Sequence, residues 1–322
     1  MSNADILLEA KGLTKEFPLK NKECVHAVSD VSLEIYRGET LALVGESGCG
    51  KSTLGRTLIQ LLRPTSGQVL LEGQDISSMG EKNFRQYRRH MQLIFQDPYA
   101  SLNPRMTVKE IIAEPLRTYK TCASEAEYTE KVLELMAAVG IPGEFLYRYP
   151  HQFSGGQRQR IGIARSIALN PSLIVCDEPV SALDVSVQNQ ILNLLKRLQQ
   201  DMSLTYLFIS HDLSVVRFIS DRVAVMFLGR LCEVGLTEEV YSSPMHPYTR
   251  FLLDSIPQAD PHSRDIKKHL LTGELPSPID PPAGCRFHTR CPYADERCHK
   301  EVPELRCVYG RMLACHRAGR LD

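Results

Sequence analysis

The chain has no net charge, because its 38 lysine and arginine residues balance its 38 aspartate and glutamate residues. A general nucleic-acid binder is usually basic, so we expect no nucleic acid among the partners. The sequence also lacks any apolar run near the about 20 residues that span a bilayer. Its first residues show no basic segment followed by an apolar one, so we expect no signal peptide and a cytosolic chain.

Apolar residues and cysteines, in contrast, are plentiful. Hydrophobic residues make up 43% of the 322 residues, which is enough for one large domain with an appendage. Ten cysteines are many for the cytosol, where disulfides rarely persist. Half of them lie after residue 284, and that cluster requires its own explanation.

One glycine-rich stretch matches the phosphate-binding pattern G-x-x-x-x-G-K-[ST]. An apolar run that predicts a buried strand precedes it, and a predicted helix follows, which argues against a chance glycine-rich turn. The glycines let backbone N–H groups face phosphate oxygens, Lys51 reaches the β- and γ-phosphates, and Ser52 ligates Mg²⁺. The candidate ATP-binding residues here are Gly45, Glu46, Ser47, Gly48, Cys49, Gly50, Lys51, Ser52 and Thr53.

Cys49 lies at the predicted start of that helix and beside Lys51. This environment lowers the pKa of a thiol. We therefore expect a reactive Cys49 whose alkylation blocks ATP binding.

Polar residues stand at the ends of three further predicted strands. Gln96 is placed to contact Mg²⁺ or the attacking water, Asp177 to hold Mg²⁺, and Glu178 to polarise a water. His211 follows the third strand, and the carboxyl ends of parallel strands line the ligand crevice of an α/β sheet. Taken singly, each has a plainer explanation as a strand-end polar residue, a turn cap or a structural histidine.

Residues from about 99 to 150 predict a helical insert, because apolar residues recur there at helical spacing. A second helix start follows the insert, and its exposed N–H groups make a second candidate anion site. This site comprises Ser154, Gly155, Gly156 and Gln157.

Over about residues 5–240, these motifs resemble in content and order the ATP-binding cassette (ABC) transporter ATPases. The match also includes Ser181-Ala182-Leu183-Asp184, while Phe153 replaces the commoner leucine before the signature. The resemblance implies an α/β fold: a P-loop ABC-type nucleotide-binding domain with an antiparallel β subdomain and a helical subdomain at about 99–160.

The resemblance further implies a head-to-tail dimer with two ATP molecules between the subunits. Each ATP would contact Lys51 of one subunit and Ser154 of the other. Phe17 would stack on adenine, and Asp184 would bridge the dimer.

Three catalytic roles are implied in the same way. Glu178 would act as the base, His211 would hold the γ-phosphate, and Gln96 would sense the nucleotide and couple it to the membrane subunits. The magnesium ligands would be Ser52, Gln96 and Asp177.

A closer resemblance, to the oligopeptide/dipeptide importer ATPases, comes from 246–253, 275–278 and 284–292. It implies a cassette at 1–240 and a cysteine-rich extension at 241–322. The chain would hydrolyse ATP to power peptide import from the cytoplasmic face of a bacterial inner membrane. Its partners would be two membrane permease subunits, a sibling ATPase in a heterodimer, and a separate substrate-binding protein.

Two alternatives to this function remain open. The cargo could be nickel, glutathione or an antimicrobial peptide, because the ATPase does not touch the cargo. A soluble ABC ATPase acting on DNA or ribosomes is less favoured by the neutral charge and the C-terminal resemblance.

The last five cysteines lie in a proline-rich segment in which we expect little regular structure. Such a segment needs a metal staple, and the spacing Cys-x5-Cys-x6-Cys is wider than in zinc sites. Thiolate ligation suits an iron–sulfur cluster, and the resemblance implies [4Fe–4S] held by Cys285, Cys291, Cys298 and Cys315. Zinc, free thiols and Cys307 as the fourth ligand remain alternatives; a disulfide is not expected.

Overall fold

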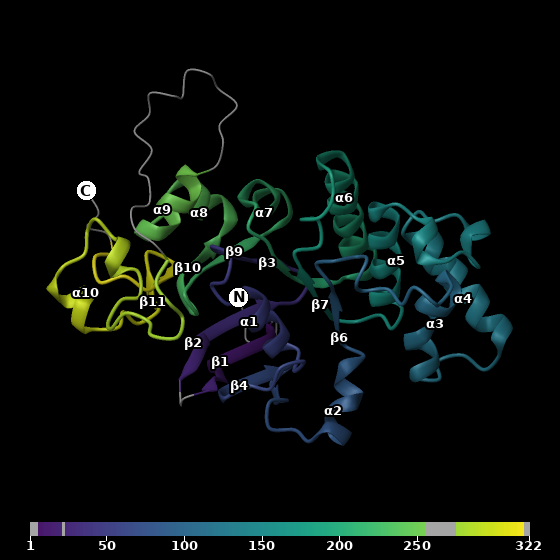
Figure 1. The fold of residues 1–322 in the computed structure, drawn as a ribbon, viewed down its shortest axis with the longest axis horizontal. Coiled ribbons are helices and arrows are strands. Elements are labelled where there is room, and N and C mark those ends of the chain that lie inside the picture. The colour runs from purple at the N-terminus through teal and green to yellow at the C-terminus, as the bar shows by residue number, and fades with distance from the viewer. Residues whose placement is uncertain (1–5, 21–22, 256–274, 319–322) are drawn as a thin grey trace, which may run out of the picture. The chain divides into compact units, whose positions relative to one another are not determined.

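The computed structural model describes residues 6–20, 23–255 and 275–318 (Figure 1). It divides into two compact units. Of the described residues, the first unit contains 6–7, 36–38 and 79–207, and the second contains 8–20, 23–35, 39–78, 208–255 and 275–318.

The strand that leads into the phosphate loop is part of the second unit. β3 (Thr40–Val44) is buried at all five positions, as its apolar sequence predicts for a strand covered on both faces. It pairs in parallel with β9 (Arg222–Phe227), which pairs antiparallel with β10 (Arg230–Leu236). β12 (Arg311–Leu313) and β11 (Arg306–Val308) continue the sheet beyond β10.

A second sheet in this unit supplies the antiparallel β subdomain. Its strands occur in the order β2 (Cys24–Tyr36), β1 (Ile6–Pro18), β4 (Ser66–Leu71) and β5 (Gln74–Asp75). β1 pairs antiparallel with β4, with Leu8 opposite Leu71. β1 and β2 each contain 13 residues.

Aromatic side chains pack the C-terminal part of the second unit onto β9. Phe227 of β9 contacts Tyr248 and Phe287, with ring centroids 4.7 and 5.3 Å apart. The helices of this unit are α1 (Lys51–Leu58), α7 (Leu213–Ile219), α8 (Thr237–Ser242), α9 (Pro247–Asp254) and α10 (Glu296–Lys300), with a short 3₁₀ turn, η6 (His288–Arg290).

The prediction of little regular structure in the cysteine-rich segment is wrong. This segment, yellow in Figure 1, contains η6, α10, β11 and β12. Its apolar residues Phe287 and Leu313 are almost fully buried, so the segment gains order by packing on the unit as well as from local sequence.

In the first unit, β6 (Met91–Ile94) pairs in parallel with β7 (Leu173–Asp177). β8 (Thr205–Ile209) is shared between the two units. The helical elements are α2 (Glu81–Arg88), α3 (Val108–Thr118), α4 (Glu125–Ala138), η3 (Gly143–Phe145), η4 (Pro150–Gln152), α5 (Gly155–Ile167) and α6 (Val185–Met202). α3 and α4 lie in the stretch where the sequence predicts helices.

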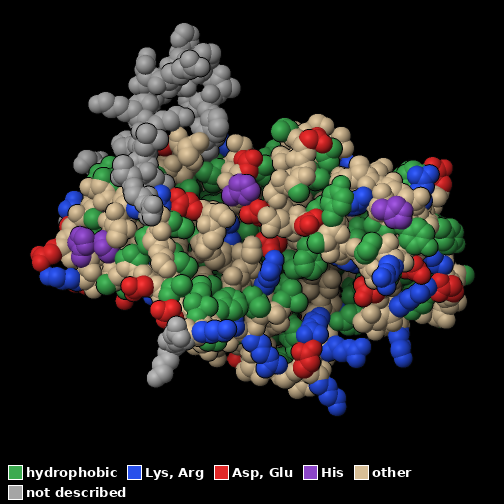
Figure 2. Space-filling model, viewed as in Figure 1, with side chains coloured by type: hydrophobic (Ala, Val, Ile, Leu, Met, Phe, Trp, Pro, Cys, Tyr) green, Lys and Arg blue, Asp and Glu red, His purple; other side chains and the backbone are tan. Residues whose placement is uncertain are grey.

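Figure 2 shows acidic and basic side chains distributed over the visible face, as expected for a chain with balanced charges. Within the described ranges, no helix is both long enough and apolar enough to cross a membrane.

Candidate functional site

The phosphate loop requires its glycines for steric reasons. Gly45, Gly48 and Gly50 have φ angles of 155°, 78° and 105°, in the region that L side chains rarely adopt. A Cβ atom at Gly50 would lie 2.0 Å from the Ala27 carbonyl oxygen, and one at Gly45 would lie 2.1 Å from that of Met226. The backbone therefore follows a path that only glycine permits.

Lys51 begins α1 and is 5% exposed. Its Nζ donates hydrogen bonds to the carbonyl oxygens of Gly45, at 2.8 Å, and Glu46, at 2.9 Å. The N-cap residue is Gly50, which has no side chain to accept from the first-turn N–H groups. Those N–H groups and the helix dipole suit a phosphate group, and Ser52 and Thr53 lie in the same turn.

Two distant residues hold Glu46 of the phosphate loop. The Glu46 N–H donates to the Tyr248 hydroxyl at 2.9 Å, and Arg290 donates to the Glu46 carboxylate at 2.8 Å. Tyr248 is fully buried and the Arg290 side chain is 7% exposed, whereas the Glu46 side chain is 25% exposed, so both contacts are partly shielded from water. Sequence reasoning missed both residues, although Tyr248 lies in a quoted C-terminal motif and Arg290 directly precedes Cys291.

The prediction of a lowered Cys49 pKa is wrong. Cys49 is 1% exposed, and burial raises the pKa of its thiol even though the Lys51 charge opposes the shift. Desolvation outweighs the helix terminus here because the thiolate would lose almost all of its water. The geometry therefore favours a packing role for this thiol over a reactive one.

In the first unit, the structure brings Gln96 and Glu178 together. Each follows one of the paired strands β6 and β7, and the Gln96 amide donates to Glu178 Oε2 at 2.9 Å. Asp177 ends β7 and is 1% exposed. Glu178 has a φ of 48°, a conformation unusual for glutamate, which turns its side chain at the strand end. A polar pair at this edge can orient a carboxylate toward a water.

The signature residues form a capping box at the start of α5. Ser154 Oγ accepts from the Gln157 N–H at 3.4 Å, and the Ser154 N–H donates to Gln157 Oε1 at 3.0 Å. A Cβ atom at Gly156 would lie 2.4 Å from a methyl carbon of Val187, so glycine allows α5 and α6 to approach. Asp184 caps α6 by accepting from the Val187 N–H at 3.0 Å.

Two neighbouring positions complete this region. Gly155 lies near Leu183, where a Cβ atom would be 3.2 Å from a methyl carbon. Phe153, at the usual leucine position, is 5% exposed and makes an edge contact with Phe145 at 5.7 Å between ring centroids. The aromatic ring thus fills a buried site and leaves Ser154 exposed.

Phe17 and His211 belong to the second unit. Phe17 lies near the end of β1 and is partly buried, and Lys15 Nζ is 4.9 Å from its ring centroid. His211 is exposed and follows β8 directly. The position of His211 just past a strand is as predicted, whereas the place of Phe17 within β1 was not predicted.

Four of the C-terminal cysteines line one small pocket: Cys285, Cys291, Cys298 and Cys315. Cys307 lies on β11, is exposed, and is not among the residues that line the pocket. Burial raises the pKa of Cys285 to about 12 and that of Cys291 to about 11. These thiols therefore stay protonated near neutral pH unless a bound cation displaces the protons.

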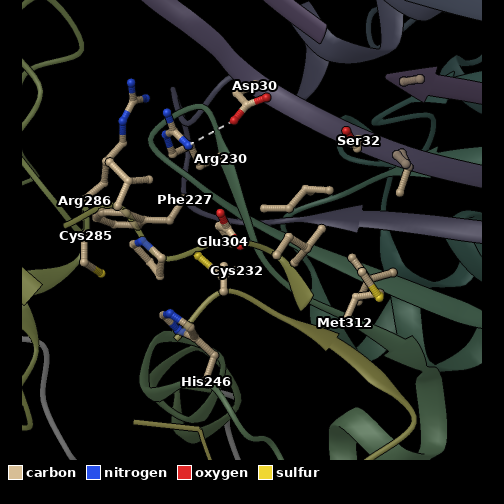
Figure 3. Close-up of a pocket in the computed structure, with 18 of the residues that line it drawn as sticks. Asp30, Ser32, Phe227, Arg230, Cys232, His246, Cys285, Arg286, Glu304 and Met312 are labelled. Atoms are coloured by element: carbon tan, nitrogen blue, oxygen red, sulfur yellow. Dashed lines mark ion pairs between the residues drawn. The ribbon is translucent and has the colours of Figure 1, made fainter. Parts of the chain in front are cut away.

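A larger cavity of about 810 Å³ lies beside this pocket, within the second unit (Figure 3). Cys285 and His246 line both spaces. Asp30 and Arg230 form an ion pair of 3.7 Å at the cavity, and burial lowers the pKa of Arg286 to about 10. Acidic and basic residues both line the cavity, so its charge selects neither anions nor cations.

Comparisons with known proteins match both halves of the chain. The ABC transporter family matches residues 28–181, and the family described as the oligopeptide/dipeptide transporter C-terminal region matches residues 232–298. The chain is 52% identical to the oligopeptide transport ATP-binding protein AppF of Bacillus subtilis, over 98% of each chain. It is 51% identical to the oligopeptide transport ATP-binding protein OppF of Escherichia coli, over 96% of each chain.

Solved structures of ATP-binding cassettes also match this chain. A dimeric post-hydrolysis structure of the ATP-binding cassette MJ0796, bound to ADP and Pi, is 31% identical with a TM-score of 0.66. The match covers 71% of this chain and 98% of that one. The structure of cbiO1 from Clostridium perfringens, part of the transporter complex cbiONQ, is 28% identical with a TM-score of 0.66, over 74% of this chain and 92% of that one. The predicted α/β fold is confirmed.

Proposed function

Because this chain belongs to the ABC transporter family, among the oligopeptide transport ATP-binding proteins, we propose that its ATP hydrolysis drives import of oligopeptides or dipeptides. ATP and Mg²⁺ are the expected cofactors of such an ATPase. The observation that carries the proposal is identity near 50% over almost the whole chain, C-terminal region included. The cassette occupies residues 1–240 and the extension residues 241–322.

ATP would bind with its phosphates on the first turn of α1. Lys51 would exchange a carbonyl contact for a phosphate oxygen, and Phe17 would stack on the adenine. Ser52, Gln96 and Asp177 would hold Mg²⁺, which when bound offsets charge on the β- and γ-phosphates.

Glu178 would accept a proton from the attacking water, while His211 holds the γ-phosphate. The Gln96 amide, 2.9 Å from Glu178 Oε2, would keep that carboxylate oriented. Nucleotide sensing by Gln96 would thus be coupled directly to the base, because Gln96 donates a hydrogen bond to Glu178.

The second half of each ATP site would come from another subunit, through Ser154, Gly155, Gly156 and Gln157, with Asp184 at the dimer contact. The dimeric MJ0796 cassette supports this assembly. A sibling ATPase, two membrane permease subunits and a substrate-binding protein would complete the importer at the cytoplasmic face of a bacterial inner membrane.

We also propose a [4Fe–4S] cluster in the cysteine pocket. Among the residues that the structure describes, three metal-ligand atoms come within 4.8 Å of one another only at Glu16, Cys24 and His26. No three of the pocket sulfurs therefore lie within 4.8 Å of one another, whereas thiolates on one tetrahedral zinc ion lie about 3.8 Å apart. A cluster, whose four irons each take one thiolate, suits that spacing better.

The cluster proposal is tested by iron, sulfide and zinc analysis of protein purified without air. We expect iron and sulfide in wild type and in Cys307→Ser, and their loss in Cys315→Ser. One zinc per chain without iron would overturn the cluster, and retention of iron in Cys315→Ser would overturn that ligand.

The cargo is tested by uptake of labelled short peptides into cells whose only copy carries Glu178→Gln. We expect uptake to disappear, since the substitution removes the base yet leaves ATP binding. Glu144→Gln, at an exposed glutamate in the same unit, is the matched control and should transport normally. Normal peptide uptake in Glu178→Gln would overturn the peptide proposal, and nickel and glutathione uptake in the same strains would then identify the alternative cargo.

A further inference from the structure

Three side chains outside the proposed ATP site form a compact group of metal-ligand types. His26 Nδ1 lies 2.7 Å from Glu16 Oε1, and His26 Nε2 lies 3.4 Å from Cys24 Sγ. One ligand atom from each residue falls within 4.8 Å of the other two. None of the three takes part in the proposed hydrolysis of ATP.

Sheet geometry brings these residues together. Cys24 and His26 are two residues apart on β2, so their side chains point to the same face. Glu16 comes from β1, the neighbour of β2 in the sheet. The arrangement is therefore fixed by backbone pairing, which gives the preorganisation that a small ion site needs.

We propose that Glu16, Cys24 and His26 bind a divalent transition-metal cation of the zinc class. A thiolate, an imidazole and a carboxylate are the ligands that Zn²⁺ takes, and three protein ligands leave a fourth position for water. Binding releases the thiol proton and replaces the hydrogen bonds of the group.

Glu16 and Cys24 contact different nitrogens of the His26 ring, Nδ1 at 2.7 Å and Nε2 at 3.4 Å, so the ring bridges the two side chains in this arrangement. One ion binds one ring nitrogen, and a tetrahedral zinc site places that nitrogen about 3.4 Å from an oxygen ligand and about 3.6 Å from a sulfur ligand. Since one ligand atom from each residue lies within 4.8 Å of the other two, rotation of the side chains would close the group around an ion. The side chains of His26 and Glu16 are 28% and 33% exposed, so an ion has a path from solvent.

The position suggests what the ion would affect. Glu16 immediately precedes Phe17, and the His26 N–H donates to the Pro278 carbonyl of the C-terminal region at 2.9 Å. A cation joining β1 to β2 would restrict the strand that carries Phe17. This consequence for ATP affinity rests on the proposed function, whereas the metal site itself does not.

Cobalt titration of the full chain tests the site, because a cobalt–thiolate bond gives a charge-transfer absorption band. With the cysteine pocket left as purified, we expect Cys24→Ser and His26→Gln to bind one equivalent fewer than wild type. Cys122→Ser removes a thiol of similar exposure and should titrate like wild type. Zinc should displace the cobalt and abolish the band.

The outcomes separate the claims. Equal stoichiometry and affinity in wild type and Cys24→Ser would overturn the site, and matching thermal unfolding curves would show that the variants fold. We expect zinc binding to change ATP affinity several-fold. Zinc binding without a change in ATP affinity would overturn the link to Phe17 but not the metal site. Loss of peptide transport in the cell assay bears only on the proposed function.

Discussion

Helices α1 and α5 both begin at residues expected to face phosphate, but the two helices satisfy their first turns differently. At α1 the N-cap is Gly50, which leaves first-turn N–H groups without a side-chain acceptor from that position. At α5 the N-cap is Ser154, whose hydroxyl and backbone exchange two hydrogen bonds with Gln157. The first helix start is shaped to take an anion, and the second largely satisfies itself.

In the dimer proposed above, this difference would make the two half-sites on each chain unequal. A hydroxyl has one donor and two acceptor lone pairs, so Ser154 can cap α5 as an acceptor and still donate to a phosphate oxygen. That single bond is weak beside the several N–H groups and the lysine at α1. In the proposed dimer, the α5 half-site would therefore be suited to recognise ATP already held by the other half-site.

The largest expected effect comes from filling the space at α1. Gly50→Ala puts a Cβ atom 2.0 Å from a backbone oxygen at a φ of 105°. We expect ATP affinity to fall by about 100-fold or more, equivalent to about 2.7 kcal/mol, as measured with a fluorescent ATP analogue. Gly48→Ala, with open space around its Cβ, is the control and should lose only about fivefold through backbone strain. Equal affinities for the two variants would contradict the steric argument.

The second effect isolates the α5 half-site. Ser154→Ala should lower the free energy of unfolding by about 1 kcal/mol through loss of the cap and reduce the ATPase rate by about 10²-fold. Ser124→Ala removes an equivalent cap at α4, where Ser124 Oγ accepts from the Glu127 N–H at 3.2 Å. It should cost similar stability and leave the ATPase rate intact, and ATP binding to the single subunit should be normal in both.

If Ser124→Ala and Ser154→Ala reduced the ATPase rate equally, stability alone would account for the effect. The proposed role of the α5 start in ATP recognition would then be wrong.

The sequence was informative where chemistry and local pattern coincide. The run from Leu41 to Val44 predicted β3, and the apolar runs before Gln96 and Glu178 predicted the strands that these two residues follow. Their mutual hydrogen bond was not predicted. Hydrophobic periodicity and motif spacing are read over a few neighbouring residues, and strands and strand-end residues are determined over the same short range.

Features that depend on long-range packing were not predictable in this way. Burial raises the Cys49 pKa more than the neighbouring Lys51 lowers it, and the contact of Cys49 with Gly229 shows that the burial involves chain far away in sequence. The order of the cysteine-rich segment depends on Phe287 packing against Phe227. The contacts of Tyr248 and Arg290 with Glu46 join residues 202 and 244 positions apart, beyond any local pattern.

Loss of the Tyr248 and Arg290 contacts gives the third and smallest expected effect. These contacts come from the C-terminal region, whereas the capping box at α5 is made by neighbouring residues alone. Tyr248→Phe removes the acceptor of the Glu46 N–H, and Arg290→Gln removes the guanidinium charge that pairs with the Glu46 carboxylate. A shielded N–H without a partner costs about 1 kcal/mol or more, so we expect ATP affinity to fall about fivefold in each variant. Arg297→Gln breaks an exposed ion pair with Glu301 in the same segment and should change nothing measurable. If all three variants bound ATP alike, the phosphate loop would be as self-contained as α5, and the C-terminal region would have no part in shaping the ATP site.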